Sequence, residues 1–171
     1  MTLRASIQIP VNNPRSLAYV LAAVQHLGET FVKGHSAMKH PFGFQLSPQG
    51  VNFIAEIIVP LDTREEIERA LDTLVELDLL YLKTHPGQPK LYQSGTRYKD
   101  PGKLAWYTAP ILLDKRAGDC KDLCGLRVAE LILQGEDARP HLKRVNESLW
   151  HVQVRRGNGS IEDPSRILGM R

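Results

Sequence analysis

The fold depends on the stretch Ala117-Gly118-Asp119-Cys120-Lys121-Asp122-Leu123-Cys124. A helical pattern starts at Asp119 and continues to about residue 134, where Gly135 can end it. A cysteine in the first turn of a helix lies among unpaired backbone N–H groups at the positive end of the helix dipole, and both stabilise a thiolate. Gly118 leaves room for a substrate to approach the sulfur. We therefore expect Cys120 to be a nucleophile with a lowered pKa.

The partners that such a thiol needs follow on two predicted strands. Residues 149–155 alternate between apolar and polar side chains, and His151 lies on the polar face. Asp163 ends a further strand, at about 160–163. A thiol nucleophile needs a base beside the sulfur and a carboxylate that orients this base. The sequence therefore predicts a catalytic triad of Cys120, His151 and Asp163 that transfers acyl groups through a thioester.

The turn between His151 and Asp163 decides whether the two side chains can meet. A two-residue turn at Asn158-Gly159 would pair residue 154 with residue 163, and Asp163 would then lie on the face opposite to His151. A three-residue loop over 157–159, with Gly159 in the left-handed conformation, pairs residue 153 with residue 163 and puts both side chains on one face. We predict the three-residue loop.

The rest of the chain predicts further strands and helices. Strands are expected at residues 5–11, 51–59 and 138–145, with a shorter one near 42–46. Helices are expected at residues 14–27 and from Asp62 to about Lys83, while residues 104–113 form a short helix or a buried segment. Asp62 and Glu65 have the spacing of a capping box for the second helix.

A domain boundary is expected at residues 85–89, where two prolines and a glycine interrupt both periodicities. Residues 1–88 are then an N-terminal α/β region of unknown role, and residues 89–171 form the core that carries the triad. The element order of the first region fits a ferredoxin-like half-sandwich, and it fits equally a set of elements that pack on the second region.

The composition is that of an ordinary globular domain. The chain has 171 residues, of which 42% are hydrophobic and 24% charged, and this length buries a core without disulfides or metals. The net charge of +3 comes from small basic groups, whereas a nucleic-acid-binding protein concentrates basic residues on one element. The first residues contain no continuous apolar run, so we expect no signal peptide, no membrane contact, a cytoplasmic location and reduced thiols.

The two cysteines do not indicate a metal site. Cys120 and Cys124 are too close for a disulfide framework, and two thiols make no zinc site by themselves. The six histidines form no pair at metal-ligand spacing, so we expect no metal and no cofactor. Cys124 is expected to be a small buried residue. The alternative for it is a resolving thiol in redox control.

Three separated motifs resemble the core of the transglutaminase-like superfamily: Gly118-Asp119-Cys120-Lys121-Asp122-Leu123, His151-Val152 and Asp163-Pro164-Ser165. This family uses a Cys-His-Asp triad on a papain-like α+β fold, and its members include protein-crosslinking transglutaminases and bacterial cysteine peptidases and amidases. The resemblance covers about the last 80 residues. It implies that the helix bearing Cys120 packs on antiparallel strands that carry His151 and Asp163.

A narrower resemblance concerns small transglutaminase-like proteins encoded among the structural genes of tailed bacteriophages. It rests on four stretches: Ser94-Gly95-Thr96-Arg97-Tyr98, Ala117-Gly118-Asp119-Cys120, Glu136-Asp137-Ala138-Arg139-Pro140 and Asp163-Pro164-Ser165-Arg166-Ile167-Leu168-Gly169-Met170. It implies phage structural proteins as partners and a location in the virion. Many transglutaminases carry an upstream Trp that assists the oxyanion, but Trp106 lies nearer to the cysteine than that spacing, so this role is not transferred.

These observations lead to one expected activity and one rival. The chain lacks the extra β-domains and calcium regulation of animal crosslinking enzymes, which favours a cysteine peptidase or amidase that hydrolyses peptide or glutamine-like amides. The rival is a phage structural or interaction protein that keeps the fold with little or no turnover. A third hypothesis, nucleic-acid binding, is disfavoured, and it predicts salt-sensitive retention on heparin.

Overall fold

The computed structural model describes residues 4–11, 43–49, 52–100, 105–146 and 149–171. The helices in these residues are α2 (Arg64–Thr84), α3 (Ala109–Lys115), α4 (Cys120–Leu133) and α5 (Pro164–Ile167), with a 3-10 turn, η1, at Leu91–Gln93. The strands are β1 (Arg4–Val11), β2 (Gly43–Gln49), β3 (Asn52–Pro60), β4 (Arg97–Tyr98), β5 (Ala105–Tyr107), β6 (Ala117–Gly118), β7 (Ala138–Arg144), β8 (Trp150–Arg156) and β9 (Ile161–Glu162). The chain therefore mixes helices and mostly antiparallel sheets, in agreement with the expected α+β class.

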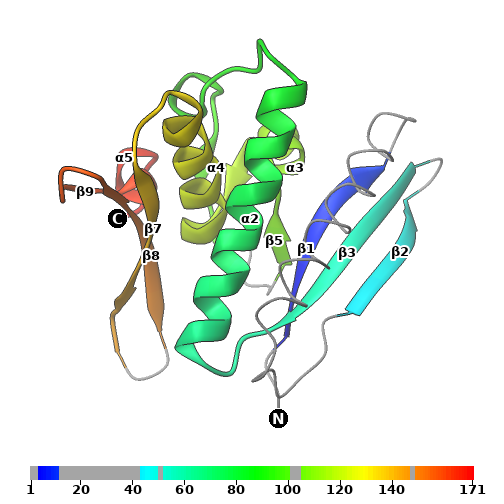
Figure 1. Cartoon of the computed structure of the whole chain (residues 1–171). Coiled ribbons are helices and arrows are strands. Elements are labelled where there is room, and N and C mark those ends of the chain that lie inside the picture. The colour runs from blue at the N-terminus through cyan, green and yellow to red at the C-terminus, as the bar shows by residue number, and fades with distance from the viewer. Residues whose placement is uncertain (1–3, 12–42, 50–51, 101–104, 147–148) are drawn as a thin grey trace.

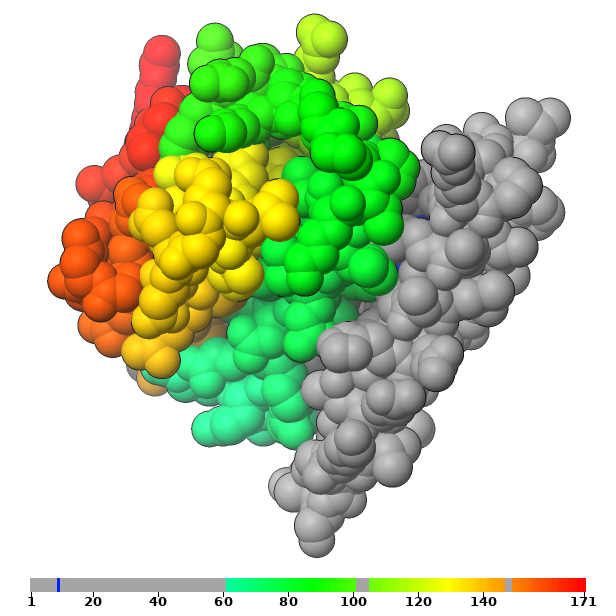
Figure 2. Space-filling view, turned by 45° about the horizontal axis from the view of Figure 1, so that its top comes forward, coloured from blue at the N-terminus to red at the C-terminus, as the bar shows by residue number. Residues whose placement is uncertain are grey.

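Two sheets enclose a pair of helices. One sheet has the strand order β2-β3-β1-β5, with β5 parallel to β1, and the other is the antiparallel sheet β7-β8-β9. Helices α2 and α4 stand side by side between these sheets (Figure 1). The surface of α2, green in Figure 2, adjoins that of α4 and β7, yellow, which in turn adjoins β8 and β9, orange. The two short strands β4 and β6 form a separate parallel pair just before α4.

One hydrophobic core connects the early and late parts of the chain. Its fully buried side chains include Ile9 on β1, Leu71 and Leu74 on α2, and Leu123 and Leu126 on α4. β1 also pairs with β5 across the expected boundary at residues 85–89. The elements before that boundary therefore pack on the elements after it, which was one of the two arrangements left open by the sequence.

Helix α2 begins one residue later than the sequence predicts. Its N-cap is Thr63, whose hydroxyl accepts a hydrogen bond from the backbone N–H of Glu66. The Glu66 carboxylate accepts in return from the backbone N–H of Thr63, at 2.9 Å. The predicted Asp62–Glu65 capping box was therefore wrong by one position. Burial explains which of the two capping boxes forms, because the observed box uses Glu66, whose side chain is buried, whereas Glu65 is exposed.

The other predicted elements agree with the structure to within a few residues. The strands predicted at 5–11, 51–59 and 138–145 are β1, β3 and β7, and the short strand near 42–46 is the longer β2. The segment 104–113 was expected to form a short helix or a buried segment, and its described residues are divided between β5 and the first part of α3. The predicted helix at 14–27 lies outside the described residues. Among the described helices, none is both long and apolar enough to cross a bilayer.

Candidate active site

Cys120 is the first residue of α4, as the sequence predicts. Asp119 is the N-cap, and its carboxylate accepts a hydrogen bond from the backbone N–H of Lys121 at 3.2 Å. The Asp122 carboxylate accepts from the backbone N–H of Asp119 at 3.3 Å, which completes a capping box. This box uses the amides on either side of Cys120. The backbone N–H of Cys120 therefore stays at the helix terminus, where a developing negative charge is stabilised.

Asp122 fixes the start of α4 to the neighbouring sheet. Its side chain is fully buried, and Oδ1 accepts a hydrogen bond from the backbone N–H of Tyr107, on β5, at 2.9 Å. The Lys121 ammonium lies 3.7 Å from the same oxygen and also pairs with Asp119. Burial outweighs these partners and raises the pKa of Asp122 to about 7. The helix terminus that carries Cys120 is thus attached to β5 through a buried carboxyl group.

His151 and Asp163 meet as the predicted hairpin requires. β8 pairs Val154 with Glu162 and Arg155 with Ile161, which is the register of the predicted hairpin. The connecting loop is therefore the three-residue loop, and Gly159 adopts a φ of +85°. The prediction of a three-residue loop is confirmed. β9 ends at Glu162, one residue before the predicted strand end at Asp163, and the Asp163 side chain still reaches His151 and Gln153. His151 Nε2 lies 2.9 Å from Asp163 Oδ2, and each side chain is 12–13% exposed.

The Asp163 carboxylate has partners that the sequence did not reveal. Gln153, two residues after His151 on the same strand, donates from Nε2 to Asp163 Oδ2 at 3.0 Å. The backbone N–H of Arg166 donates to Oδ1 at 3.2 Å, because Asp163 is also the N-cap of α5. Although partial burial opposes ionisation, these hydrogen bonds hold the pKa of Asp163 below its usual value. An ionised Asp163 keeps the proton of the His151 ring on Nε2, which leaves Nδ1 as the basic nitrogen.

The Cys120 thiol differs from the expectation in its acidity. Burial, followed by the negative charge of Asp119, raises the pKa of Cys120 to about 11. The backbone N–H of Val152 donates a hydrogen bond to the sulfur, and the charge of Lys121 also favours the thiolate, but both effects are smaller. The prediction of a lowered pKa was therefore wrong for the protein without substrate. That prediction relied on the helix terminus and on a nearby histidine, and it left out the burial of the sulfur against β8.

Two further predictions around the cysteines have different outcomes. Gly118 is buried, and a Cβ built there would lie 2.4 Å from a methyl group of Leu112 and 3.1 Å from Cβ of Asp122. The glycine therefore allows close packing inside the protein, and not the approach of a substrate as predicted. Cys124 is fully buried, as expected, and its thiol donates to the backbone oxygen of Gln153 at 3.1 Å.

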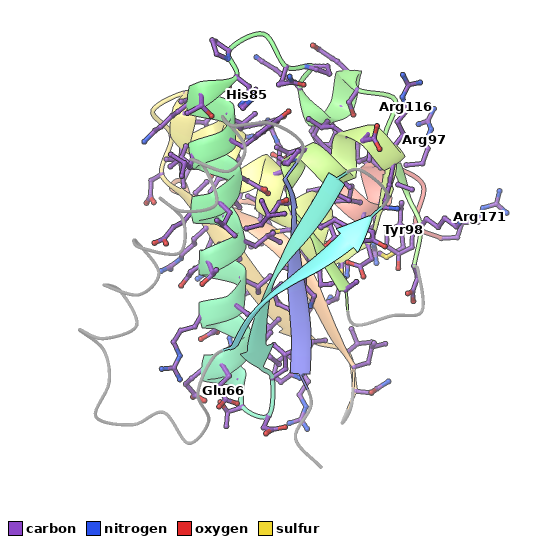
Figure 3. The ribbon with its side chains drawn as sticks, turned by 90° about the vertical axis from the view of Figure 1, so that its right-hand side faces the viewer. Glu66, His85, Arg97, Tyr98, Arg116 and Arg171 are labelled. Atoms are coloured by element: carbon purple, nitrogen blue, oxygen red, sulfur yellow. The ribbon has the colours of Figure 1, made fainter. Side chains whose placement is uncertain are left out.

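Cys120 and His151 line one open cleft of about 930 Å³. Its walls include Tyr98 of β4, Trp106 of β5 and Trp150 of β8. Arg171 and Tyr98 lie on one side of the molecule, where the Arg171 side chain extends outward (Figure 3), and both line the cleft. Asp163 is not part of this lining and lies behind His151. The Cys120 and His151 side chains thus face one space, and the Asp163 carboxylate is not part of its lining.

A second polar cluster surrounds Glu162, the residue before Asp163. Its carboxylate accepts hydrogen bonds from the Tyr92 hydroxyl at 2.5 Å, from Arg127 Nε at 2.6 Å and from an Arg156 guanidinium nitrogen at 3.1 Å. Arg127 also pairs with Glu130 at 3.1 Å. These partners hold the pKa of Glu162 below its usual value. We call these residues the Glu162 cluster; it fixes β9, and hence the backbone that leads into Asp163.

A thiol at a helix terminus, in one cleft with a histidine that a carboxylate holds, has the side chains that nucleophilic chemistry at a carbonyl group needs. Among the described residues, no group of three or more His, Cys, Asp or Glu side chains is arranged to hold a metal ion. No protein-family model, curated protein or solved structure that was compared with this chain matches it. The assignment of a function therefore depends on the geometry of Cys120, His151 and Asp163.

Proposed function

We propose that this protein is a thiol-dependent acyl-transfer enzyme with a transglutaminase-like, papain-like core. The observation that carries the proposal is the 2.9 Å contact of His151 with Asp163, in a cleft that His151 shares with Cys120 at the start of α4. A cysteine at a helix terminus, a histidine on a strand and a carboxylate that holds the far ring nitrogen are the three parts of a thiol triad. The resemblance noted in the sequence gives the same roles to these residues.

The reaction follows from the positions of the protons. His151 Nε2–H donates to Asp163, so the Nδ1 lone pair takes the proton of the Cys120 thiol. The sulfur then attacks the carbonyl carbon of an amide, and a C–S bond forms as the carbonyl π-bond opens. The tetrahedral intermediate collapses when His151 gives its proton to the leaving amine, and a thioester remains on Cys120. Water, activated by His151, attacks the thioester, and the acid product and the free thiol are released.

The backbone supplies the stabilisation that the intermediate needs. The N–H of Cys120 lies outside the capping box at the positive end of α4, where an oxyanion is favoured. The raised pKa of Cys120 means that the thiol is protonated at rest. His151 must therefore remove the proton as the substrate binds, and the enzyme does not rest as a thiolate–imidazolium pair.

The preferred reaction is hydrolysis of a peptide or glutamine-like amide, that is, a peptidase or amidase activity. The cleft is open to solvent beside Cys120 and His151, so water has access to the thioester. An amine that enters the same cleft would give transamidation instead. The proposed chemistry is complete with the thiol, the imidazole and the carboxylate, and it uses no cofactor.

The proposal is tested by the alkylation of Cys120 with iodoacetamide against pH, read by mass spectrometry in the natural chain and in His151→Ala. Because His151 is proposed to accept the thiol proton as the sulfur attacks, we expect Cys120 to react at neutral pH faster than its raised pKa alone would allow, and His151→Ala to remove this advantage. Cys124→Ala is the matched control, because it removes the buried thiol one turn away and leaves the site unchanged. Reaction of Cys120 only near pH 11, to the same extent in both proteins, would overturn the proposal.

One observation favours a second candidate, a phage structural or interaction protein with this fold and little turnover. The raised pKa of Cys120 is what a buried thiol without a catalytic role would have. This candidate predicts that Cys120→Ala leaves the function of the protein intact, in particle assembly or in partner binding. The enzyme proposal predicts the opposite, since no thioester forms without the sulfur.

A further inference from the structure

The cleft that holds Cys120 and His151 is lined by more cations than acids. Among the described lining residues, the cationic side chains are Lys121, Lys143, Arg144, Arg166 and Arg171, and the acidic ones are Asp100 and Asp119. Asp119 pairs with Lys121, which cancels one charge of each sign. The cleft therefore carries an excess of positive charge beside the reacting groups.

Lys143 has the most direct relation to His151. It lies directly opposite His151 in the β7–β8 register. Side chains that oppose each other in an antiparallel pair project from one face, with their Cβ atoms about 5 Å apart. Lys143 is exposed, so its ammonium group can meet a ligand in the cleft. A negative group placed next to the reacting carbonyl would thus lie near the Lys143 ammonium.

Arg166 and Arg144 add further positive charge to the lining of the cleft. Arg166 is 74% exposed and reaches Asp163 only at 3.6 Å. Arg144 lies over the ring of Trp150 at 5.7 Å, and Arg64 lies over the same ring at 5.6 Å. Base stacking needs an open aromatic face, but the two arginines lie over Trp150 and Trp106 is buried, so these two rings favour a peptide over nucleic acid as the ligand.

We infer that the cleft selects acidic peptides, with glutamate or aspartate side chains next to the amide that Cys120 attacks. The inference rests on the proposed function for the identity of the reacting amide. A peptide carboxylate would meet Lys143 on β7 and Arg166 on α5, on either side of His151. A concave site lined by charge of one sign concentrates ligands of the opposite sign and speeds their association.

Two chloroacetyl peptides of equal length test this, one with two glutamates and one with two lysines after the reactive group. The rate at which each peptide alkylates Cys120 is measured in the full chain by mass spectrometry. The rate for the glutamate peptide is divided by the rate for the lysine peptide, and this ratio is divided by the corresponding ratio for the alkylation of glutathione, which gives the corrected ratio. We expect the glutamate peptide to be favoured about tenfold at low salt. The corrected ratio of the two rates should fall towards one at high salt, since salt screens exposed charges.

Lys143→Glu and Arg139→Glu form a matched pair of variants. Both reverse an exposed charge on β7, but Arg139 does not line the cleft. Lys143→Glu should remove most of the preference, and Arg139→Glu should keep it. A corrected ratio near one in the natural chain, or an equal loss in both variants, would overturn the inference. So would protection of Cys120 by a polythymidine oligonucleotide together with no preference between the peptides.

The same data separate this inference from the proposed function. If both peptides react at the rate of an ordinary thiol, independently of His151, but the glutamate peptide is still favoured, the catalytic proposal fails and the charge preference stands. If both react fast and need His151 but show no preference, the catalytic proposal stands and the acidic-peptide inference fails.

Discussion

Glu162 and Asp163 are neighbouring carboxylates that belong to two different regions of the molecule. Glu162 turns into a closed cluster in which Tyr92, Arg127 and Arg156 donate to its two oxygens. Asp163 turns towards His151, which lines an open cleft and which we propose to act as the base there. Both carboxyl groups have lowered pKa values, so acidity does not distinguish them. They differ in their partners: the partners of Glu162 hold β9 in place, whereas His151, the partner of Asp163, also has the proposed role of base. Substitutions at Glu162 should therefore affect stability, and substitutions at Asp163 should affect activity.

The largest expected effect is on activity, from Asp163→Asn. An asparagine retains the size of the side chain, but it removes the charge that holds the His151 proton on Nε2. We expect the acylation rate of Cys120 by p-nitrophenyl acetate to fall by about 10³-fold, by analogy with the loss in a serine triad with the wrong tautomer. Glu162→Gln is the matched control on the adjacent residue and should lower the rate by less than about tenfold, because it shifts β9 without changing the tautomer. Equal losses in the two variants would mean that Asp163 acts only through the structure of β9.

For stability we expect the opposite order: Glu162→Gln should have a larger effect than Asp163→Asn. Glu162→Gln replaces an acceptor of three charged or hydroxyl donors by an amide that cannot satisfy all of them. We expect the free energy of unfolding in urea to fall by about 2 kcal/mol, a value reduced for the partial solvent exposure of the cluster. Asp163→Asn should cost less, since asparagine also caps the N-terminus of α5. A larger loss of stability for Asp163→Asn would contradict the division into two regions.

The pH dependence of stability should also divide between regions. Glu162 and Asp163 have folded pKa values below the unfolded ones, so their contribution is complete above about pH 4.5 and is lost as the pH falls below it. Asp122 has the opposite sign: burial raises its pKa to about 7, the folded protein keeps a proton that the unfolded chain has lost, and stability falls as the pH rises from about 4 to 7.

Urea midpoints measured from pH 2 to pH 8 test these signs. In a plot of the urea midpoint against pH, Glu162→Gln should reduce the slope below about pH 4.5, and Asp122→Asn should reduce the slope between about pH 4 and pH 7. Glu68→Gln serves as the control, because Glu68 forms an exposed pair with Arg64 and should leave both sides unchanged. A natural chain whose stability rises steadily up to pH 8 would contradict the raised pKa of Asp122.

The sequence predicted the contact of His151 with Asp163, but it did not predict the Glu162 cluster. The alternation in β8 and the spacing of Gly157 and Gly159 determine a strand register, so the meeting of His151 and Asp163 followed from local rules. The Glu162 cluster joins η1, α4, β8 and β9, and no local pattern in any of these elements brings Tyr92 to Glu162. Contacts of this kind depend on how the elements pack, which periodicity does not specify.

Two errors of the sequence analysis have the same origin. Thr63 and Asp62 both have a cap-forming side chain followed by a glutamate three residues later, so the motif alone gives two start points for α2. The helix-terminus rule gave Cys120 a low pKa, but the rule describes an exposed terminus and this sulfur is buried against β8 with Asp119 beside it. In both cases the local rule was incomplete because burial selects among the states that the local rule allows.

The smallest predicted effect concerns the edge of the Glu162 cluster. Tyr92 contributes a hydroxyl donor to Glu162 and a ring that Arg127 covers at 5.0 Å. Tyr92→Phe removes only the hydroxyl and should lower the free energy of unfolding by about 1 kcal/mol. Tyr92→Leu removes the ring as well and should cost about 0.5–1 kcal/mol more, the value of an exposed cation–π contact. Neither change reaches His151, so Cys120 should keep its acylation rate in both variants. If the acylation rate falls together with the free energy of unfolding, the Glu162 cluster and the cleft are coupled. Glu162 would then position Asp163 as well as stabilise β9.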